Sequence, residues 1–390
     1  MRSHPTVSSL QLCVLLLSML NLAGCGGGGS AVGGGSNPPP PPPPPPAEFL
    51  YAATLGGQVT TLDIDSSNGS LTSAGSSAGS NGVSIAVNPA GTFLYAADLS
   101  TNAIDGLSIS STGALSTISG SPFSAPGDGG ILGVAVDPSG KFLYATTDTA
   151  SGGSGTGLVV VFSIDSTTGA LSPVAGSPFP AGVSPTELVV APSGQFLYVS
   201  DSASGILAFS VASGTLTPIA GSPFPSGSRG LAVTPGAAYL YAIDVDNVVS
   251  AFSIDSATGA LTQVSGSPFL DSAGSGNFTG VVIVDPTGSF LYTYNTFGAP
   301  NTISGFAVDS STGALSPVAG SPFSTGETTF SAANLEIEPS GKFIYASCAD
   351  GNCGILEFSI DATTGALTPA TGAPFDLEFY VGGLAAVSLQ

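Results

Sequence analysis

Three observations predict an all-β protein. The 390 residues include 55 glycines and 31 prolines but no tryptophan, a composition typical of short strands joined by turns. The hydrophobic fraction is 42% and only 7% of the residues are charged, so the chain can bury a core. An apolar triplet that ends in tyrosine recurs seven times from residue 49 onward. Such a repeat favours one array of small units over several unrelated domains.

Residues 1–24 predict a lipoprotein signal peptide. Arg2 precedes the apolar run Leu10–Leu22, which is too short to cross a bilayer as a helix. The run ends in Leu-Ala-Gly-Cys25, which resembles the bacterial lipobox. We therefore expect export and lipidation of Cys25, which would anchor the chain to the cell envelope, and Gly26 is compatible with the outer membrane. The alternative is an ordinary secretory signal in which Cys25 has no role.

Residues 25–47 predict a tether. The segment 26–36 is rich in glycine, and nine consecutive prolines follow at Pro38–Pro46. The glycine-rich part is expected to be a flexible coil, whereas the prolines should form a stiff polyproline II spacer of roughly 28 Å, at about 3.1 Å per residue. Recognition of the proline run by a partner is the alternative to a spacer.

Residues 48–390 contain the repeated unit, and each unit predicts four strands. In one copy the first three strands are Leu231–Val233, Tyr239–Ala242 and Val249–Ile254, and the fourth follows a turn at 255–261. The first two strands are almost continuously apolar, which indicates burial of both faces, as in stacked sheets. The tyrosine of the triplet lies in the second strand, at Tyr51, Tyr95, Tyr144, Tyr198, Tyr241, Tyr292 and Tyr345. A period near fifty residues with four strands is typical of a propeller blade.

Turn residues separate these strands. Proline fixes φ, glycine supplies φ > 0, and aspartate or threonine caps the bend with its side chain. The motif Gly-Ser-Pro-Phe ends the fourth strand, at 120–123, 176–179, 221–224, 266–269 and 320–323, with Gly-Ala-Pro-Phe at 372–375. Only the first unit lacks this ending.

The two ends of the repeat array predict a closed ring. The first unit begins at its second strand, because the proline run before Phe49 cannot supply a first strand. The chain ends with an extra strand of the first type, 383–389. If this last strand completes the first blade, seven four-stranded blades close without open sheet edges. The predicted fold is therefore an all-β, seven-bladed β-propeller closed by the C-terminal strand.

The units also carry a family resemblance. Phe196-Leu197-Tyr198-Val199-Ser200-Asp201, followed by the strands 206–211 and 215–218, resembles the blades of the seven-bladed propeller lactonases. That family includes 6-phosphogluconolactonases and a carboxymuconate-lactonizing enzyme. The resemblance covers residues 49–390 and implies lactone hydrolysis in a channel that contains histidine, arginine and acidic groups. Its motifs specify blades and not a reaction.

The charge balance restricts the chemistry. Four Lys and Arg against 25 Asp and Glu give a net charge of −21, which excludes a nucleic-acid binder. The one histidine is His4, in the predicted signal peptide, so mechanisms with a histidine base or a histidine-ligated metal are not available to the processed chain. Its cations are Lys141, Arg229 and Lys342. We expect no cofactor.

Arg229 is a candidate binding residue. It lies just before a first strand, in the connection that reaches the channel mouth of a propeller, and it could bind an anionic ligand. The scaffold does not require arginine there, because the other units have Val83, Leu132, Thr186, Gly280 and Ala333. The alternatives are an ion pair with Glu187 of the adjacent blade, or a solvated side chain.

Two glutamates in the last unit are candidate catalytic groups. Glu336 and Glu357 replace small apolar residues of the other units, in a first and a third strand. Burial is costly for carboxylates and would raise their pKa values, so the pair could serve as general acid and base in glycoside or lactone hydrolysis. Exposure at an edge, or hydrogen bonding to neighbours, is the alternative.

Aspartates recur at two turns of the unit. Five lie three to five residues after the repeat tyrosine and could collect Ca²⁺, or accept hydrogen bonds from backbone N–H groups in the turn: Asp98, Asp148, Asp201, Asp244 and Asp350. Five others follow the third strand and have the same structural interpretation: Asp65, Asp165, Asp255, Asp309 and Asp361. Lys141 and Lys342 are expected to be solvated turn residues.

Cys348 and Cys353 flank a short hairpin in the last unit. In an oxidising compartment they would most simply form a disulfide, because a metal site would lack further ligands.

Two functional hypotheses remain. The first is a lipid-anchored, extracytoplasmic propeller that serves as a binding module for an envelope protein or for a small anionic or carbohydrate-like ligand, favoured here because the processed chain lacks histidine and has few cations. The second is a lactone hydrolase of the resembled family, acting through carboxylates and Arg229. A purely structural role in the envelope stays open.

Overall fold

A computed structural model gives the fold of the repeat region. The chain divides into two units, 1–44 and 45–390, and every residue that the structure describes belongs to the second. The described segments are 47–78, 82–126, 129–147, 156–226, 228–244, 248–270, 280–295, 301–326, 332–348, 354–370, 374–377 and 380–389. The predicted signal peptide, Cys25 and the proline run lie outside these segments.

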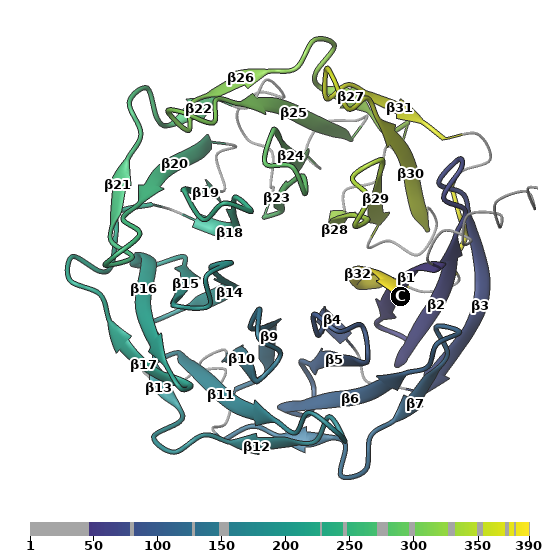
Figure 1. The fold of residues 1–390 in the computed structure, drawn as a ribbon, viewed down its shortest axis with the longest axis vertical. Coiled ribbons are helices and arrows are strands. Elements are labelled where there is room, and N and C mark those ends of the chain that lie inside the picture. The colour runs from purple at the N-terminus through teal and green to yellow at the C-terminus, as the bar shows by residue number, and fades with distance from the viewer. Residues whose placement is uncertain are drawn as a thin grey trace, which may run out of the picture. The chain divides into compact units, whose positions relative to one another are not determined.

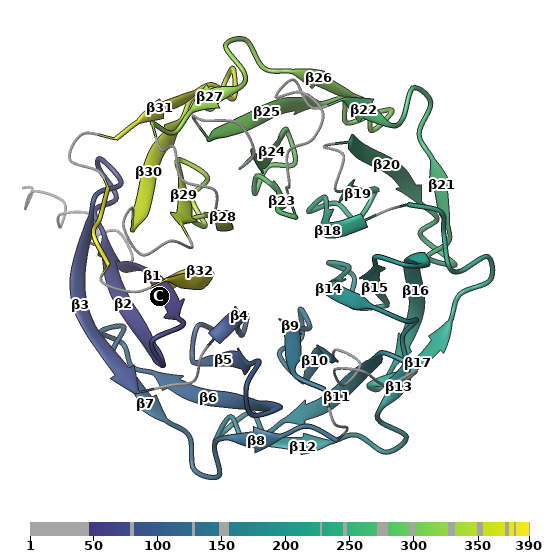
Figure 2. The ribbon, with the colours of Figure 1, turned by 180° about the vertical axis from the view of Figure 1, so that it is seen from behind.

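Seven antiparallel sheets form a ring around a central channel (Figures 1 and 2). The described residues contain strands and turns but no helix, and accordingly no helix that could cross a membrane. The predicted all-β, seven-bladed propeller is therefore confirmed.

Each blade places one strand beside the channel and further strands outward. The innermost strands are β32 (Val381–Leu389), β4 (Gly82–Val87), β9 (Ile131–Val136), β14 (Pro185–Val190), β18 (Ser228–Val233), β23 (Val282–Val284) and β28 (Ala332–Ile337). The second strands are β1 (Ala47–Thr54), β5 (Phe93–Asp98), β10 (Phe142–Thr147), β15 (Phe196–Asp201), β19 (Tyr239–Asp244), β24 (Phe290–Asn295) and β29 (Phe343–Cys348). The third strands are β2 (Gln58–Ile64), β6 (Ala103–Ile109), β11 (Leu158–Ile164), β16 (Gly205–Ala212), β20 (Val248–Ile254), β25 (Thr302–Val308) and β30 (Ile355–Ile360).

The outermost strands are β3 (Leu71–Ala78), β7 (Leu115–Thr117), β12 (Leu171–Pro173), β17 (Thr215–Pro218), β21 (Leu261–Gln263), β26 (Leu315–Pro317) and β31 (Leu367–Pro369). Four blades add a two-residue strand, which is β8 (Phe123–Ser124), β13 (Phe179–Pro180), β22 (Phe269–Leu270) or β27 (Phe323–Ser324). Blades are numbered 1 to 7 along the chain from β1, so that blade 1 consists of β32 and β1–β3.

The Gly-Ser-Pro-Phe motif interrupts the outer edge of a blade instead of ending one continuous strand. In blade 2 the hydroxyl of Ser121 accepts a hydrogen bond from Gly106 N–H at 3.0 Å, and Phe123 then pairs with Ile104 of β6. The same serine contact recurs in blades 3, 4, 5 and 6. Blade 1 lacks the motif, and its outer strand β3 runs uninterrupted for eight residues.

The C-terminal strand closes the ring, as predicted. Strand β32 pairs antiparallel with β1, from Ala47 opposite Leu389 to Thr54 opposite Val381. The innermost strands also contact one another from blade to blade around the whole ring. Val381 and Leu384 of β32 are buried, so the last strand is part of the core of blade 1.

A repeated hydrogen bond from a tyrosine hydroxyl to a glycine carbonyl, called the clasp below, joins neighbouring blades. The hydroxyl of Tyr51 donates a hydrogen bond to the carbonyl of Gly113, a turn residue of the next blade, at 3.0 Å. That glycine has φ = 76°, and a Cβ atom there would collide with the ring of Phe49, so the position requires glycine. Equivalent bonds of 2.8–3.0 Å are donated by Tyr95, Tyr198, Tyr241, Tyr292 and Tyr345.

Blades 3 and 4 lack this clasp. In blade 4 four residues, 212–215, lie between the paired Val211 and Leu216, and the tip of this turn is Ser213-Gly214, with φ of 50° and 80°. In blade 3 six residues, 165–170, lie between the equivalent pair Ile164 and Leu171. Gly214 still packs against Phe142, but the buried hydroxyl of Tyr144 has no hydrogen-bond partner among the residues that the structure describes. A shortened turn therefore removes one of the seven tyrosine bonds.

Candidate functional site

The central channel contains a cavity of about 240 Å³ at the end where the innermost strands begin. Five blades contribute to its wall: Val83, Ser84, Leu132, Gly133, Thr186, Glu187, Gly280, Val281 and Asn334. Each innermost strand is the inner edge of its sheet, so its backbone groups face the channel without a further strand to pair with. Polar side chains at this wall can satisfy those groups and also contact a ligand.

Of the described residues that line this cavity, only Glu187 is ionisable. It lies in β14 between Thr186 and the buried Leu188, with its side chain exposed to the solvent of the channel. The surrounding blades nevertheless restrict its hydration, and this desolvation raises the pKa of Glu187 to about 8, against an opposing hydrogen bond from Leu231 N–H. A carboxyl group with this pKa can exchange protons near neutral pH.

A hydroxyl pair fixes the strand that carries Glu187. The hydroxyls of Thr186 and Ser200 lie 2.7 Å apart, and Ser200 accepts a hydrogen bond from Glu187 N–H at 2.9 Å. Both hydroxyls also contact the carbonyl oxygen of Arg229 in the next blade, at 3.2 and 3.0 Å. This network ties β14 to β18, so the backbone of Glu187 is held in place relative to blade 5.

Arg229 lies at the same end of the ring, near the start of β18, with an exposed side chain. Its Cβ is 3.7 Å from the place where a Cβ on Gly280 of the cavity wall would lie. The arginine is therefore close to the mouth of the channel, as the repeat alignment predicts.

Glu336 lies two residues further along its strand than the cavity residue Asn334. It accepts a hydrogen bond from Ala386 N–H of blade 1 at 3.0 Å, and burial raises its pKa to about 8. Glu187 and Glu336 make the same kind of contact. Each carboxylate accepts a hydrogen bond from a backbone N–H in the innermost strand of the next blade.

Glu357 lies away from the channel. In blade 7 it is opposite Tyr345, which is itself opposite Glu336, so the three side chains share one face of the sheet. Glu357 is buried in the seam with blade 1 and accepts a hydrogen bond from Leu71 N–H at 3.2 Å. Burial raises its pKa. The structure does not bring Glu357 into the cavity, so an acid–base pair of Glu336 and Glu357 has no shared space for a substrate.

The predicted turn aspartates bind backbone groups. Asp201 accepts hydrogen bonds from four N–H groups, those of residues 183, 184, 203 and 204, at 2.6–3.0 Å. Asp98 and Asp244 accept from the turns that follow them, whereas Asp148 and Asp350 lie outside the described residues. Asp65, Asp165, Asp255, Asp309 and Asp361 accept N–H groups of their own turns. No cluster of three metal-ligating side chains occurs among the described residues.

Other predicted residues contribute nothing to the cavity. Lys141 and Lys342 are exposed, each directly before a second strand, at the opposite end of the ring. Cys348 ends β29, and its predicted disulfide partner Cys353 lies outside the described residues.

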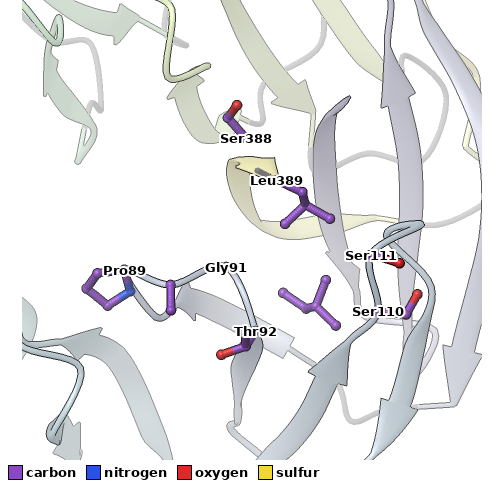
Figure 3. A pocket seen from close by; sticks show the side chains of 9 residues that line it. Pro89, Gly91, Thr92, Ser110, Ser111, Ser388 and Leu389 are labelled. Carbon is purple, nitrogen blue, oxygen red and sulfur yellow. The ribbon is translucent and has the colours of Figure 1, made fainter. Parts of the chain in front are cut away.

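A larger hollow of about 460 Å³ also lies at the opposite end, between blades 1 and 2 (Figure 3). Pro89, Thr92, Ser110 and Leu389 contribute to its wall, and none of the residues that line it is ionisable. Volume alone therefore does not locate the chemistry.

Asn334 of the channel cavity was not singled out from the sequence, although it is a large polar residue where the aligned units have Ser84, Gly133 and Val281.

Comparisons with solved structures agree with this architecture. A candidate 6-phosphogluconolactonase from Bacteroides fragilis is 20% identical, with a TM-score of 0.71 over 88% of this chain and 98% of that one. The periplasmic gluconolactonase PpgL of Pseudomonas aeruginosa is 18% identical, with a TM-score of 0.71 over 88% of this chain and 100% of that one. At these identities the similarity shows the fold. No protein of curated function matches the chain.

A family model decides between the two functional hypotheses. The model described as "Lactonase, 7-bladed beta-propeller" matches residues 115–223 and 206–377, which is more than half of the chain. The hypothesis favoured above, a binding module without catalysis, is thereby corrected, because its argument from missing histidines and cations excluded particular mechanisms and not carboxylate catalysis. The chain belongs to the seven-bladed β-propeller lactonase family.

Proposed function

We propose that the protein hydrolyses lactones in the central channel, with Glu187 as the catalytic residue. One observation carries this proposal: among the described residues the cavity wall holds a single ionisable group, Glu187, and its pKa of about 8 suits proton transfer near neutral pH. Membership of the lactonase family supports the reaction class.

The chemistry needs one base and one attacking water. The ionised carboxylate of Glu187 takes a proton from water, and the resulting hydroxide attacks the lactone carbonyl carbon. The tetrahedral oxyanion then collapses, the bond to the ring oxygen breaks, and Glu187 returns its proton to that oxygen. The product is an open-chain hydroxy acid, whose carboxylic acid group then ionises and releases one proton to the solvent.

Neighbouring groups can bind the substrate. The Asn334 amide and the Thr186 hydroxyl line the same cavity and can donate hydrogen bonds to substrate oxygens. Arg229 near the channel mouth can stabilise negative charge that develops on the substrate.

We further propose that the chain is exported and anchored through Cys25, with a disulfide between Cys348 and Cys353. The lipobox-like sequence at 22–25 and the tether that follows support the anchor. The name of PpgL, a periplasmic gluconolactonase with the same fold, supports an extracytoplasmic location. Incorporation of a radiolabelled fatty acid into the full chain, lost in Cys25→Ala, is the measurement for lipidation.

A lactone panel tests the catalytic proposal. Residues 47–390 are assayed against five- and six-membered sugar lactones, with and without phosphate, by the acid released above the spontaneous rate. We expect Glu187→Gln to lower kcat/KM at least 100-fold, since general base catalysis contributes about 10²–10⁴-fold.

Glu357→Gln is the matched control, because it removes a second carboxyl of raised pKa that lies outside the cavity. It should leave kcat/KM within about twofold of the wild type. Equal losses in both variants, or no turnover of any lactone, would contradict the proposal.

A further inference from the structure

Carboxyl groups outnumber cations among the described residues at the channel mouth. Asp98, Asp201 and Asp244 end their second strands beside the starts of the innermost strands, and Glu187 lies just inside. The backbone of Asp376 lies against Gly354, which precedes a third strand at the same end, and Asp376 is exposed. Among the described residues, one cation, Arg229, accompanies these five carboxyl groups.

The other two cations are too distant to balance this charge. Lys141 and Lys342 directly precede second strands of six residues, at the end of the ring opposite to the mouth. A strand of that length spans about 20 Å at roughly 3.3 Å per residue. The Debye length is about 8 Å at physiological ionic strength, so solvent ions largely screen the lysines from the mouth.

The cavity wall offers neutral hydrogen-bonding groups. Besides Glu187, its polar side chains are Ser84, Thr186 and Asn334, which suit the hydroxyl groups of a sugar. Its volume of about 240 Å³ is below the usual range of about 300–1,000 Å³ for ligand pockets. A single sugar ring is therefore the appropriate size of ligand.

We infer that the channel takes uncharged sugar lactones and discriminates against lactones that carry a phosphate. The inference rests on the proposed function and adds the substrate class. A phosphate dianion is bound by several cationic or N–H donors arranged around it. Here it would approach an end of the ring where Asp244 and Asp376, together with the buried and hydrogen-bonded Asp98 and Asp201, accompany one described cation, Arg229. A phosphate and these carboxylates repel each other even in water, and the repulsion is stronger where the channel walls exclude water.

The test compares D-glucono-1,5-lactone with its 6-phosphate, and with the 6-O-methyl ether as a neutral control for size. At about 20 mM salt we expect the kcat/KM of the phosphorylated lactone to be at least tenfold below that of both neutral lactones. This difference in kcat/KM between the neutral and the phosphorylated lactones should become smaller at about 500 mM salt, because screening weakens the repulsion. Thr186→Lys, which adds a cation at the cavity, should also make the difference in kcat/KM smaller.

A second readout does not depend on turnover. Calorimetry measures binding of the non-hydrolysable glucono-1,5-lactam and of its 6-phosphate, and we expect the neutral lactam to bind at least tenfold more tightly. If no lactone is hydrolysed but the neutral lactam binds more tightly, the proposed function fails and the inferred selectivity stands. Preference for the phosphorylated ligand at low salt, lost in Arg229→Ala, would overturn the inference, as would failure of both lactams to bind.

Discussion

Two interfaces between blades differ from the others in their hydrogen bonds. The interface of blades 7 and 1, which closes the ring, has additional bonds, whereas the interface of blades 3 and 4 lacks one. Between blades 7 and 1, Tyr345 keeps its bond to Gly69, and Glu336 and Glu357 add bonds to Ala386 and Leu71. Between blades 3 and 4, a turn shortened by two residues leaves the buried hydroxyl of Tyr144 without a hydrogen-bond partner among the described residues. The blade repeat thus tolerates the loss of a clasp where the chain is continuous, while the closing seam, where the two ends of the array meet, carries additional bonds.

The largest effect is expected from removing the closing strand. A chain that stops at Tyr380 lacks β32, so β1 loses its inner partner and the core loses Val381 and Leu384. We expect loss of the single cooperative unfolding transition, measured by calorimetry and by near-ultraviolet circular dichroism. A truncated chain that unfolds cooperatively at the wild-type temperature would show that closure is not needed.

The carboxylates of the closing seam make stability depend on pH. Folded Glu336 holds its proton up to a pH near 8, whereas an unfolded glutamate releases it near about 4.3. Unfolding therefore releases a proton between these values, and the free energy of unfolding falls as the pH rises from about 4 to 8.

Glu336→Gln keeps an acceptor for Ala386 N–H and removes this titration. We expect the variant to be more stable than the wild type by about 2 kcal/mol at pH 9 and equal to it at pH 4, as measured by urea unfolding. If the difference in the free energy of unfolding between the variant and the wild type does not change with pH, burial of the charged form of Glu336 is not its cause.

The tyrosines of the two seams should respond differently to the same change. Tyr345→Phe removes a buried hydrogen bond and leaves Gly69 O without its donor, at an expected cost of about 1–2 kcal/mol. Tyr144→Phe removes a hydroxyl that has no partner in the described part of the chain, so we expect no loss or a small gain in the free energy of unfolding. Equal costs in chemical denaturation would mean that the hydroxyl of Tyr144 is bonded in solution.

The smallest predicted effect is restoration of the missing clasp. Replacing residues 212–215 with the six-residue turn 165–170 of blade 3 should bring a glycine carbonyl to Tyr144 and stabilise the protein by about 1 kcal/mol. In a double-mutant cycle, Tyr144→Phe should cancel this gain. A gain that survives the substitution would have to come from the turn itself.

The ring was predictable from sequence because its determinants are local and repeated. Strand periodicity, the turn residues and the unpaired strands at the two ends together gave seven blades and their closure, as the pairing of Ala47 with Leu389 confirms. The interruption of the outer strands was not predicted, because the contact of Ser121 with Gly106 depends on how the chain bends back after the turn.

The candidate site was less predictable. Glu336 and Glu357 are both replacements of small residues, but only the register with Tyr345 shows that they face the seam with blade 1. Asn334 and Glu187 come together at one cavity because blades distant in sequence face each other across the channel. By contrast, the unpaired hydroxyl of Tyr144 follows from turn length, which is visible in the sequence.

The pairing of β32 with β1 also sets the timing of folding during synthesis. Blade 1 receives its inner strand only after roughly 330 further residues have been made, which takes about 15 to 65 s at about 5–20 residues per second. Until then the inner edge of β1 can pair with other strands, including those of a second nascent chain. A chain released before residues 381–389 are translated would keep this edge open, a ready target for proteases and chaperones.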